Sequence, residues 1–270
     1  MHIPGASLAF AAAVAASLAT PAAATDAALQ AAVASPARAP EAVARDGARH
    51  PVESLAFWGL KPGATVIEIT PGGGYWTEIL APYAKATGGR YVAAVTDIDN
   101  PKTSEAARKG RADFEARYAD PAKWGKVEYV GFGPQSKPLG PPGSADLVIT
   151  ARNVHNWMMA GFTDKAFADF HAVLKSGGVL AVEDHRSDPR PPAEGVKDGY
   201  ISTASVVAAA QKAGFKLAAS SEINANPKDT KDYPNGVWSL PPSLDGGETD
   251  KAKYEAIGES DRMTLKFVKP

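Results

Sequence analysis

The sequence predicts an α/β fold in which helices cover both faces of a doubly wound, mainly parallel sheet of seven strands. Short apolar runs rich in β-branched residues alternate along the chain with longer segments of helical character. This alternation is typical of βαβ units, whose strands lie parallel and whose crossovers are right-handed. The first of the runs is apolar at nearly every position, as expected of a strand that is covered on both faces.

The elements follow in order from these patterns. The run at residues 64–70, Ala-Thr-Val-Ile-Glu-Ile-Thr, is the best candidate for a central strand. Further strands are expected at residues 90–96, 127–132, 146–150, 178–182, 215–223 and 263–268. Helices are expected between them at residues 75–86, 104–118, 164–174 and 203–213.

Residues 1–24 have the pattern of a secretory signal peptide. An apolar run from Leu8 to Ala19 precedes a stretch of small residues, and cleavage is expected after Ala24. The segment before the run departs from the pattern because it contains no Lys or Arg. The run is too short and too rich in alanine to span a bilayer comfortably. We therefore expect a periplasmic or secreted protein whose mature chain has no stable membrane insertion.

The mature chain divides into two parts. Residues 25–60 are expected to form a helical extension, and residues 61–270 a single large domain with a long loop at 224–260. Loops of this length in compact domains are usually functional or disordered. We expect the first half to form an ordered rim with Trp238 as its aromatic anchor. The charged segment 245–259 is expected to be mobile.

Composition excludes several classes of function. The chain has 29 Lys and Arg against 30 Asp and Glu, so it lacks the basic surplus that nucleic acid attracts. It has no cysteine, which removes disulfides, thiolate nucleophiles and cysteine-based metal sites. We therefore expect a small-molecule substrate and no nucleic-acid partner. The oligomeric state is left open.

A glycine-rich turn directly follows the first expected strand. Residues 66–74 read Val-Ile-Glu-Ile-Thr-Pro-Gly-Gly-Gly, and a helix follows. Backbone N–H groups and the positive helix end therefore face a pocket at the carboxyl edge of the sheet. A dinucleotide site would read G-x-G-x-x-G, but residues 75–77 are Tyr-Trp-Thr and the third glycine is missing. A P-loop is excluded as well, because no Gly-Lys-Ser/Thr follows.

This turn resembles the first motif of class I S-adenosylmethionine-dependent methyltransferases, in which an acidic residue precedes glycines at two-residue spacing. Glu68 stands at the acidic position, and Gly72 and Gly74 stand at the second and third glycine positions. Thr70, followed by a proline, replaces the first glycine, so the turn must differ in detail. The resemblance implies a Rossmann-like methyltransferase fold and S-adenosyl-L-methionine as the cofactor. It places Gly73 in the cofactor site with the other two glycines.

The resemblance is closest to exported bacterial proteins that are predicted to be methyltransferases and carry a Pro-Gly-Gly-Gly-Tyr turn. It covers the chain from about Arg45 to Pro270. Besides the turn, the segments that carry it are residues 49–51, 152–157, 183–186, 226–229 and 261–263. It supports the fold and the cofactor more than the substrate, so the methyl acceptor stays unidentified.

Two further cofactor contacts are expected at strand ends. Asp97 follows the second strand, where an acidic residue commonly holds the ribose hydroxyls of the cofactor. The alternative is a surface aspartate that ends the strand. Phe132 ends the third strand, where the acidic residue often found near the adenine is lacking, and could stack on the ring instead.

Polar side chains follow the fourth and fifth strands, at the edge where doubly wound sheets carry their reactive groups. Methyl transfer is an in-line displacement, so orientation and exclusion of water supply most of the acceleration. A base is needed only where the acceptor must lose a proton. His155 is the first candidate and His185 the second. We expect His155 in a polar loop, where truncation leaves little cavity.

Other polar residues near these strand ends are candidates for orienting the acceptor. Asn153 is a further candidate catalytic residue. Asn153 and Asn156 would hold the acceptor by amide hydrogen bonds, while Trp157 forms an aromatic wall. His50 would close the pocket from the helical extension. The alternative for the residues after the fourth strand is that they tie loops together. Around His50, ion pairing among the charged residues of 45–49 is the alternative.

A metal site and two other functions are alternatives to methyl transfer. A metal site at Asp184, His185 and Asp229 lacks recognisable ligand spacing, so no metal is expected. Export separates the protein from the cytoplasm, where S-adenosylmethionine is made. One alternative is therefore an exported, non-catalytic ligand-binding protein on the same fold. Another is a hydrolase or lyase that uses His155 and Asp184.

Overall fold

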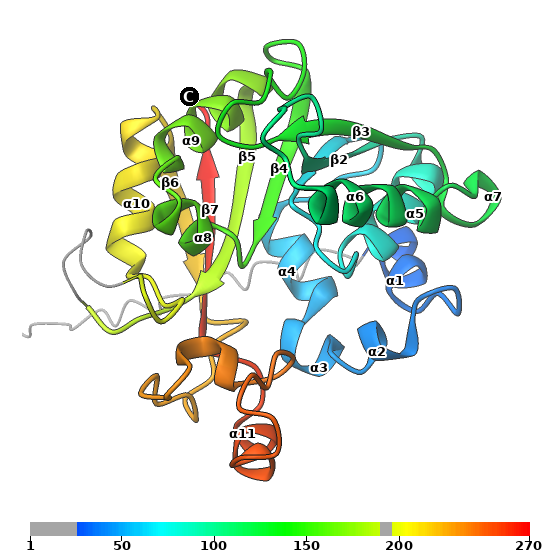
Figure 1. Ribbon diagram of the computed structural model, residues 1–270. Helices are drawn as coiled ribbons and strands as arrows, with labels where there is room; N and C mark the ends of the chain where they lie inside the picture. The colour runs from blue at the N-terminus through cyan, green and yellow to red at the C-terminus, as the bar shows by residue number, and fades with distance from the viewer. Residues whose placement is uncertain (1–25, 190–195) are drawn as a thin grey trace, which may run out of the picture.

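A seven-stranded sheet forms the middle layer of the protein (Figure 1). The computed structural model describes residues 26–189 and 196–270, so the predicted signal peptide lies outside the described residues. The strands are β1 Thr65–Ile69, β2 Arg90–Thr96, β3 Val127–Phe132, β4 Ala145–Ala151, β5 Leu174–His185, β6 Lys216–Ser221 and β7 Arg262–Val268. Their order is β3-β2-β1-β4-β5-β7-β6. The first five are parallel, and β7 runs antiparallel to both of its neighbours.

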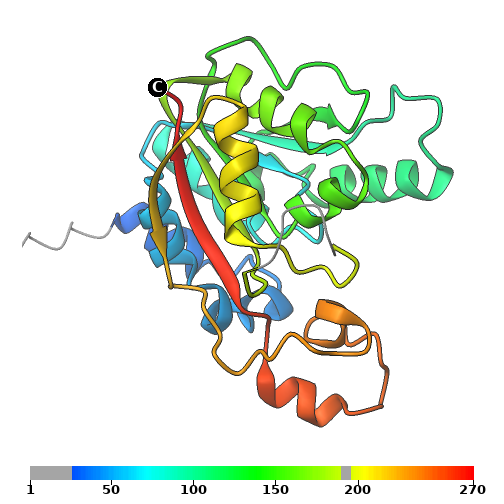
Figure 2. The ribbon, with the colours of Figure 1, turned by 90° about the vertical axis from the view of Figure 1, so that its left-hand side faces the viewer.

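Helices cover both faces of this sheet (Figures 1 and 2). The helices on one side are α1 Ala27–Val33, α4 Pro51–Trp58, α5 Thr77–Thr87 and α6 Glu105–Arg117. The helices on the other side are α8 Val154–Met159, α9 Thr163–Val173 and α10 Thr203–Lys212. Shorter helices are α2 Pro40–Val43, α3 Asp46–Arg49, α7 Pro121–Trp124, the 3-10 helix Gly236–Ser239 and α11 Lys251–Ile257. The predicted doubly wound architecture is confirmed.

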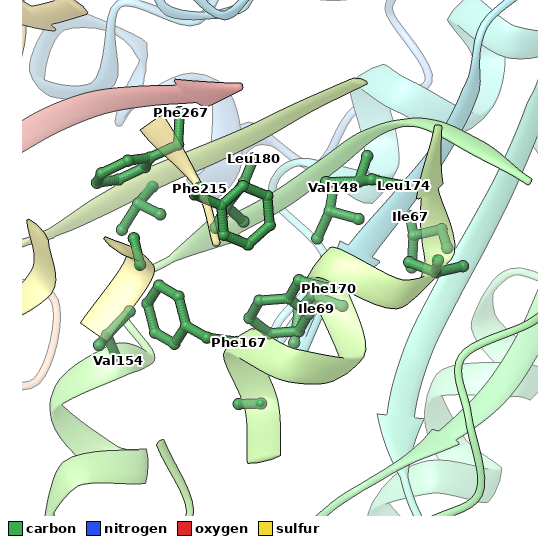
Figure 3. Close-up of a cluster of buried hydrophobic side chains, with 14 of the residues drawn as sticks. Ile67, Ile69, Val148, Val154, Phe167, Phe170, Leu174, Leu180, Phe215 and Phe267 are labelled. Atoms are coloured by element: carbon green, nitrogen blue, oxygen red, sulfur yellow. The ribbon is translucent and has the colours of Figure 1, made fainter. Parts of the chain in front are cut away.

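The apolar run that predicted a central strand becomes β1, which lies between β2 and β4. Ile67 and Ile69 belong to the same buried cluster as Phe167 and Phe170 of α9 (Figure 3). Val66 contributes to the core on the opposite face. Both faces of β1 are therefore buried, which explains why its sequence is apolar without alternation.

The strand order reverses between β1 and β4. From β1 the chain adds β2 and β3 on one side, and it then returns to add β4 and β5 on the other. The connections that follow these two strands leave the sheet in opposite directions, which opens a crevice beyond their carboxyl ends. In Figure 1 this edge is the lower one, where α2, α3 and α11 lie.

The segment 245–259 is folded, whereas the sequence predicted that it is mobile. It contains α11, whose Tyr254 packs against Tyr233 with 5.6 Å between ring centroids. Together with the buried Leu240, these aromatic rings form a small separate core that orders the charged segment. The segment projects beyond the carboxyl edge of the sheet (Figure 2). Within the described ranges, none of the helices has the length and apolar character needed to cross a bilayer.

Candidate functional site

A pocket of about 800 Å³ lies at the reversal point of the strand order. Residues 68–73, at the end of β1 and in the turn after it, and residues 151–153, at the end of β4, line it. The helical extension contributes residues from 39 to 49, and the C-terminal segment contributes residues between 241 and 259. The pocket therefore lies where doubly wound proteins bind their ligands.

The turn after β1 presents bare backbone to this pocket. Gly72 and Gly73 line it, and a Cβ at either position would meet no protein atom within 4 Å. Gly72 has a φ of +57°, and Thr70, at the position of the missing first glycine, has a φ of +51°. Gly74 is different, because a Cβ there would overlap the hydroxyl of Tyr118. The last glycine is therefore required by packing, and it does not line the pocket.

Glu68 connects the turn to the body of the sheet. Its side chain is buried, and Oε2 accepts hydrogen bonds from Thr77 Oγ1 at 2.9 Å and from the Tyr91 hydroxyl at 2.5 Å. Burial raises the pKa of Glu68 to about 7, although the two hydrogen bonds oppose this shift. The carboxyl group lines the pocket beside the glycine turn.

Asn153 joins the two strand ends that form the floor. Its Nδ2 donates to the carbonyl oxygens of Ile69 at 3.0 Å and Thr70 at 3.4 Å, and it lies 3.3 Å from Thr150 Oγ1. Asn153 also lines the pocket. The predicted orienting residue is thus in the pocket, with its amide nitrogen engaged in holding the turn.

An arginine cluster lies at the pocket, with the guanidinium of Arg49 4.3 Å from the ring centroid of Tyr75. We define it as Arg45, Arg49, Arg152 and Arg262 with the carboxylates Glu259 and Glu183. Glu259 accepts from Arg45 Nε at 2.6 Å, from Arg49 Nε at 3.2 Å and from Arg262 Nη1 at 2.6 Å. Arg262 Nη1 also lies 3.1 Å from Glu183 Oε1. These pairs connect the helical extension to β7 and to the C-terminal segment.

His155, Asp184 and His185 form a buried group that does not line the pocket. His155 Nδ1 lies 2.8 Å from Asp184 Oδ1, and the two imidazole centroids are 5.0 Å apart. Burial, together with the charges of His155 and Arg152, holds the pKa of His185 well below its usual range. Sequence reasoning expected both histidines at the reacting atoms, and the structure places them behind the pocket floor.

The same three residues offer potential metal-ligand atoms within 4.8 Å of one another. Asp184, however, already accepts hydrogen bonds from the backbone N–H groups of Val154 and His155 and of its neighbour His185. His185 Nδ1 lies 2.5 Å from Ser260 Oγ. The carboxylate is therefore organised to hold the start of α8, and this arrangement does not favour a metal ion.

His155 is buried, so its truncation is expected to reduce stability, contrary to the expectation from the sequence. Its ring is only 2% exposed and packs against His185 and Trp238. We expect His155→Ala to lower the free energy of unfolding by roughly 2–3 kcal/mol, because it leaves a cavity and removes a partner of Asp184. Urea unfolding measures this difference.

Asn156→Ala is the matched control, because this neighbour on α8 is exposed. It should change stability by no more than about 0.5 kcal/mol. Equal stability of His155→Ala and the parent would show that the buried imidazole is not a structural contact.

Five other predicted residues lie outside the pocket lining. Trp157 and Phe132 face each other in the hydrophobic core, 5.4 Å apart between ring centroids, so neither forms a wall of the pocket. Asp97 accepts from the N–H of Asp99 just after β2 and does not line the pocket. His50 Nδ1 lies 3.3 Å from Asn224 Oδ1 and ties the extension to the C-terminal segment. Asn156 is exposed.

The sequence assigned no binding role to two pocket residues, Arg49 and Arg152. Arg152 was visible as part of the dense polar run after the fourth strand. Arg49 carried no such signal, because its partner Glu259 lies 210 residues away.

Solved structures share this fold. A methyltransferase dependent on S-adenosylmethionine from Aquifex aeolicus is 18% identical, with 84% of this chain and 93% of that chain covered at a TM-score of 0.52. The (4+2)-cyclase SpnF is 14% identical over 82% of this chain and 80% of its own, with a TM-score of 0.55. The PH0226 protein from Pyrococcus horikoshii is 12% identical over 87% and 94%, at 0.51.

No protein-family model matches the sequence. No curated protein matches it significantly. The structural likeness shows the fold alone, and the chain has the Rossmann-like fold of S-adenosylmethionine-dependent methyltransferases.

Proposed function

We propose that the protein binds S-adenosyl-L-methionine in the pocket between β1 and β4 and transfers its methyl group to a small acceptor. The observation that carries this proposal is the glycine turn at the strand-order reversal, where Gly72 and Gly73 leave open space against bare backbone. A pocket of about 800 Å³ has the size of a small-molecule site. The SpnF cyclase among the similar structures means that the fold does not by itself determine the reaction.

The residues on the β1 side fit this cofactor. Gly72 and Gly73 would accommodate it against the backbone, and the carboxyl group of Glu68 lies beside them to interact with its cationic groups. When bound, the cofactor supplies an electrophilic methyl group on a sulfonium.

The remaining pocket residues would position the acceptor and exclude water. Asn153 lies at the end of β4, while Pro241, Pro242 and Leu244 cover the opposite side. His155 and Asp184 act in this proposal as positioning residues, because their contacts hold the start of α8 directly after Asn153. Export through residues 1–24 stays a prediction from the sequence.

Titration calorimetry with S-adenosylmethionine and S-adenosylhomocysteine tests the proposal. We expect both to bind the folded protein at one site per chain. A well-folded protein that binds neither would rule the proposal out. Binding of both, without transfer to any offered acceptor, would instead favour a non-catalytic ligand-binding protein.

A further inference from the structure

Arg152 is a partly buried cation without a partner of its own. Within residues 26–189 and 196–270 its guanidinium makes no ion pair and no hydrogen bond, and its Nε is buried and unsatisfied. Buried guanidinium groups without partners are costly, so each one requires an explanation. Arg152 is one of the residues that line the pocket.

The backbone of Arg152 is held firmly in an unusual conformation. Its φ is +61°, in the left-handed region that residues other than glycine rarely adopt, and its N–H donates to the Glu183 carbonyl oxygen at 2.8 Å. Such strain persists where the surrounding structure determines it and occurs frequently at binding sites. The backbone conformation of Arg152 is therefore fixed directly after β4.

The arginine cluster around Arg152 carries surplus positive charge. Its four guanidinium groups face two carboxylates, Glu259 and Glu183. Burial and the neighbouring charges of Arg49 and Arg45 lower the pKa of Arg152 to about 9, which still leaves it protonated at neutral pH. An anion in the pocket would relieve both the desolvation and the repulsion.

We propose that Arg152 binds a carboxylate of the methyl acceptor, so that the acceptor is a small organic acid. This inference rests on the proposed function. The planar guanidinium matches a carboxylate with two parallel hydrogen bonds. Tyr75, Trp76 and Leu244 also line the pocket and provide apolar surface for the rest of the molecule.

The charge of the cluster favours an acidic acceptor over the cofactor sulfonium. Glu68 and the glycine turn belong to the end of β1, whereas Arg152 follows the neighbouring strand β4, where the charges of Arg49 and Glu259 act on it. Surplus positive charge disfavours the cationic sulfonium of the cofactor beside it. An acidic acceptor balances that charge.

Matched acids and amides test the inference directly. Protein saturated with S-adenosylhomocysteine is titrated with benzoate and benzamide, and with butyrate and butyramide. We expect each acid to bind roughly tenfold or more tightly than its amide, because only the acid gains the charge-assisted pair. Equal binding within both pairs, or no binding of either acid by protein that binds S-adenosylhomocysteine, would overturn it.

Arg152→Asn removes the charge while keeping a residue that tolerates a positive φ. We expect this variant to lose the preference for acids and to unfold at a urea concentration no lower than the parent. Arg152→Lys should retain part of the preference. Arg90→Gln is the control, because Arg90 forms an exposed pair with Glu128 outside the pocket. A clearly lower unfolding midpoint of Arg152→Asn would instead assign the residue a structural role.

The cofactor carboxylate is the other possible source of the anion. 5′-Methylthioadenosine lacks the amino-acid part of S-adenosylhomocysteine and therefore distinguishes the two. If Arg152→Asn weakens S-adenosylhomocysteine but not methylthioadenosine, the arginine binds the cofactor and the inference fails. A parent protein that binds no S-adenosylhomocysteine would contradict the proposed function itself, and the acid and amide titrations can still be measured on it.

Discussion

Gly72→Val is expected to abolish the binding of S-adenosylhomocysteine while the protein remains folded. The side chain would enter the open space of the pocket, because no protein atom lies within 4 Å of a Cβ at this position. The φ of +57° adds a cost of roughly 1–2 kcal/mol for a residue other than glycine. Titration calorimetry measures the lost affinity, and urea unfolding measures the remaining stability.

Gly88→Val is the control that separates the loss of affinity from the loss of stability. Gly88 ends α5 with a φ of +72°, and a Cβ there also meets no atom within 4 Å, but it does not line the pocket. It should therefore lose comparable stability and keep full affinity. If both variants bind S-adenosylhomocysteine as the parent does, the cofactor does not lie against the glycine turn.

Arg262→Met is expected to lower the free energy of unfolding by roughly 3–5 kcal/mol, because it leaves two buried carboxylates without their shared cation. The Arg262 side chain is 1% exposed and contacts Glu259, Glu183 and the carbonyl oxygen of Ala48. Methionine preserves much of the volume of the arginine side chain, so the loss of unfolding free energy reports mainly on the removed charge. Urea unfolding at neutral pH measures it.

The same cluster predicts a loss of stability in acid. Burial alone would raise the pKa of Glu259, but the charges of Arg262, Arg49 and Arg45 outweigh it and lower the pKa from 4.5 to about 2. A carboxyl group with a lowered pKa stabilises the folded state above its ordinary pKa, and this stabilisation disappears as the pH falls toward 2. Unfolding free energies measured between about pH 5 and pH 2.5 should therefore decline less steeply in Arg262→Met than in the parent.

Arg90→Met is the control for Arg262→Met. Its pair with Glu128 is exposed, and such pairs contribute no more than about 1 kcal/mol. A loss in Arg262→Met no larger than the loss in this control would show that the arginine cluster does not stabilise the fold.

The sequence was sufficient for the fold because its signals are local. The β-branched run of β1 and the glycines after it can be recognised within about ten residues of sequence. A buried strand requires the run, and the turn that follows requires the glycines. Their place at the carboxyl edge of the sheet followed from the turn between a strand and a helix, whereas the strand order came from the structure. Glu68, Gly72 and Gly73 line the pocket, whereas Gly74 of the same predicted set does not.

The polar residues after β4 were harder to place. Asn153 and His155 are two positions apart, yet Asn153 lines the pocket and His155 is buried against His185. The difference arises because α8 begins at Val154, where Asp184 accepts the first N–H groups of the helix. A polar run in a sequence does not show which of its members a helix will turn into the core.

The sequence alone determined the layered α/β architecture and the glycine turn, because periodicity and turn residues act over short stretches of chain. Only the tertiary structure decided which charged groups surround the pocket. Arg49 meets Glu259 across 210 residues, and the unpartnered guanidinium of Arg152 becomes evident only when all its neighbours are in place. The physical reason is that burial and the balance of charge depend on contacts between distant segments, which local patterns do not encode.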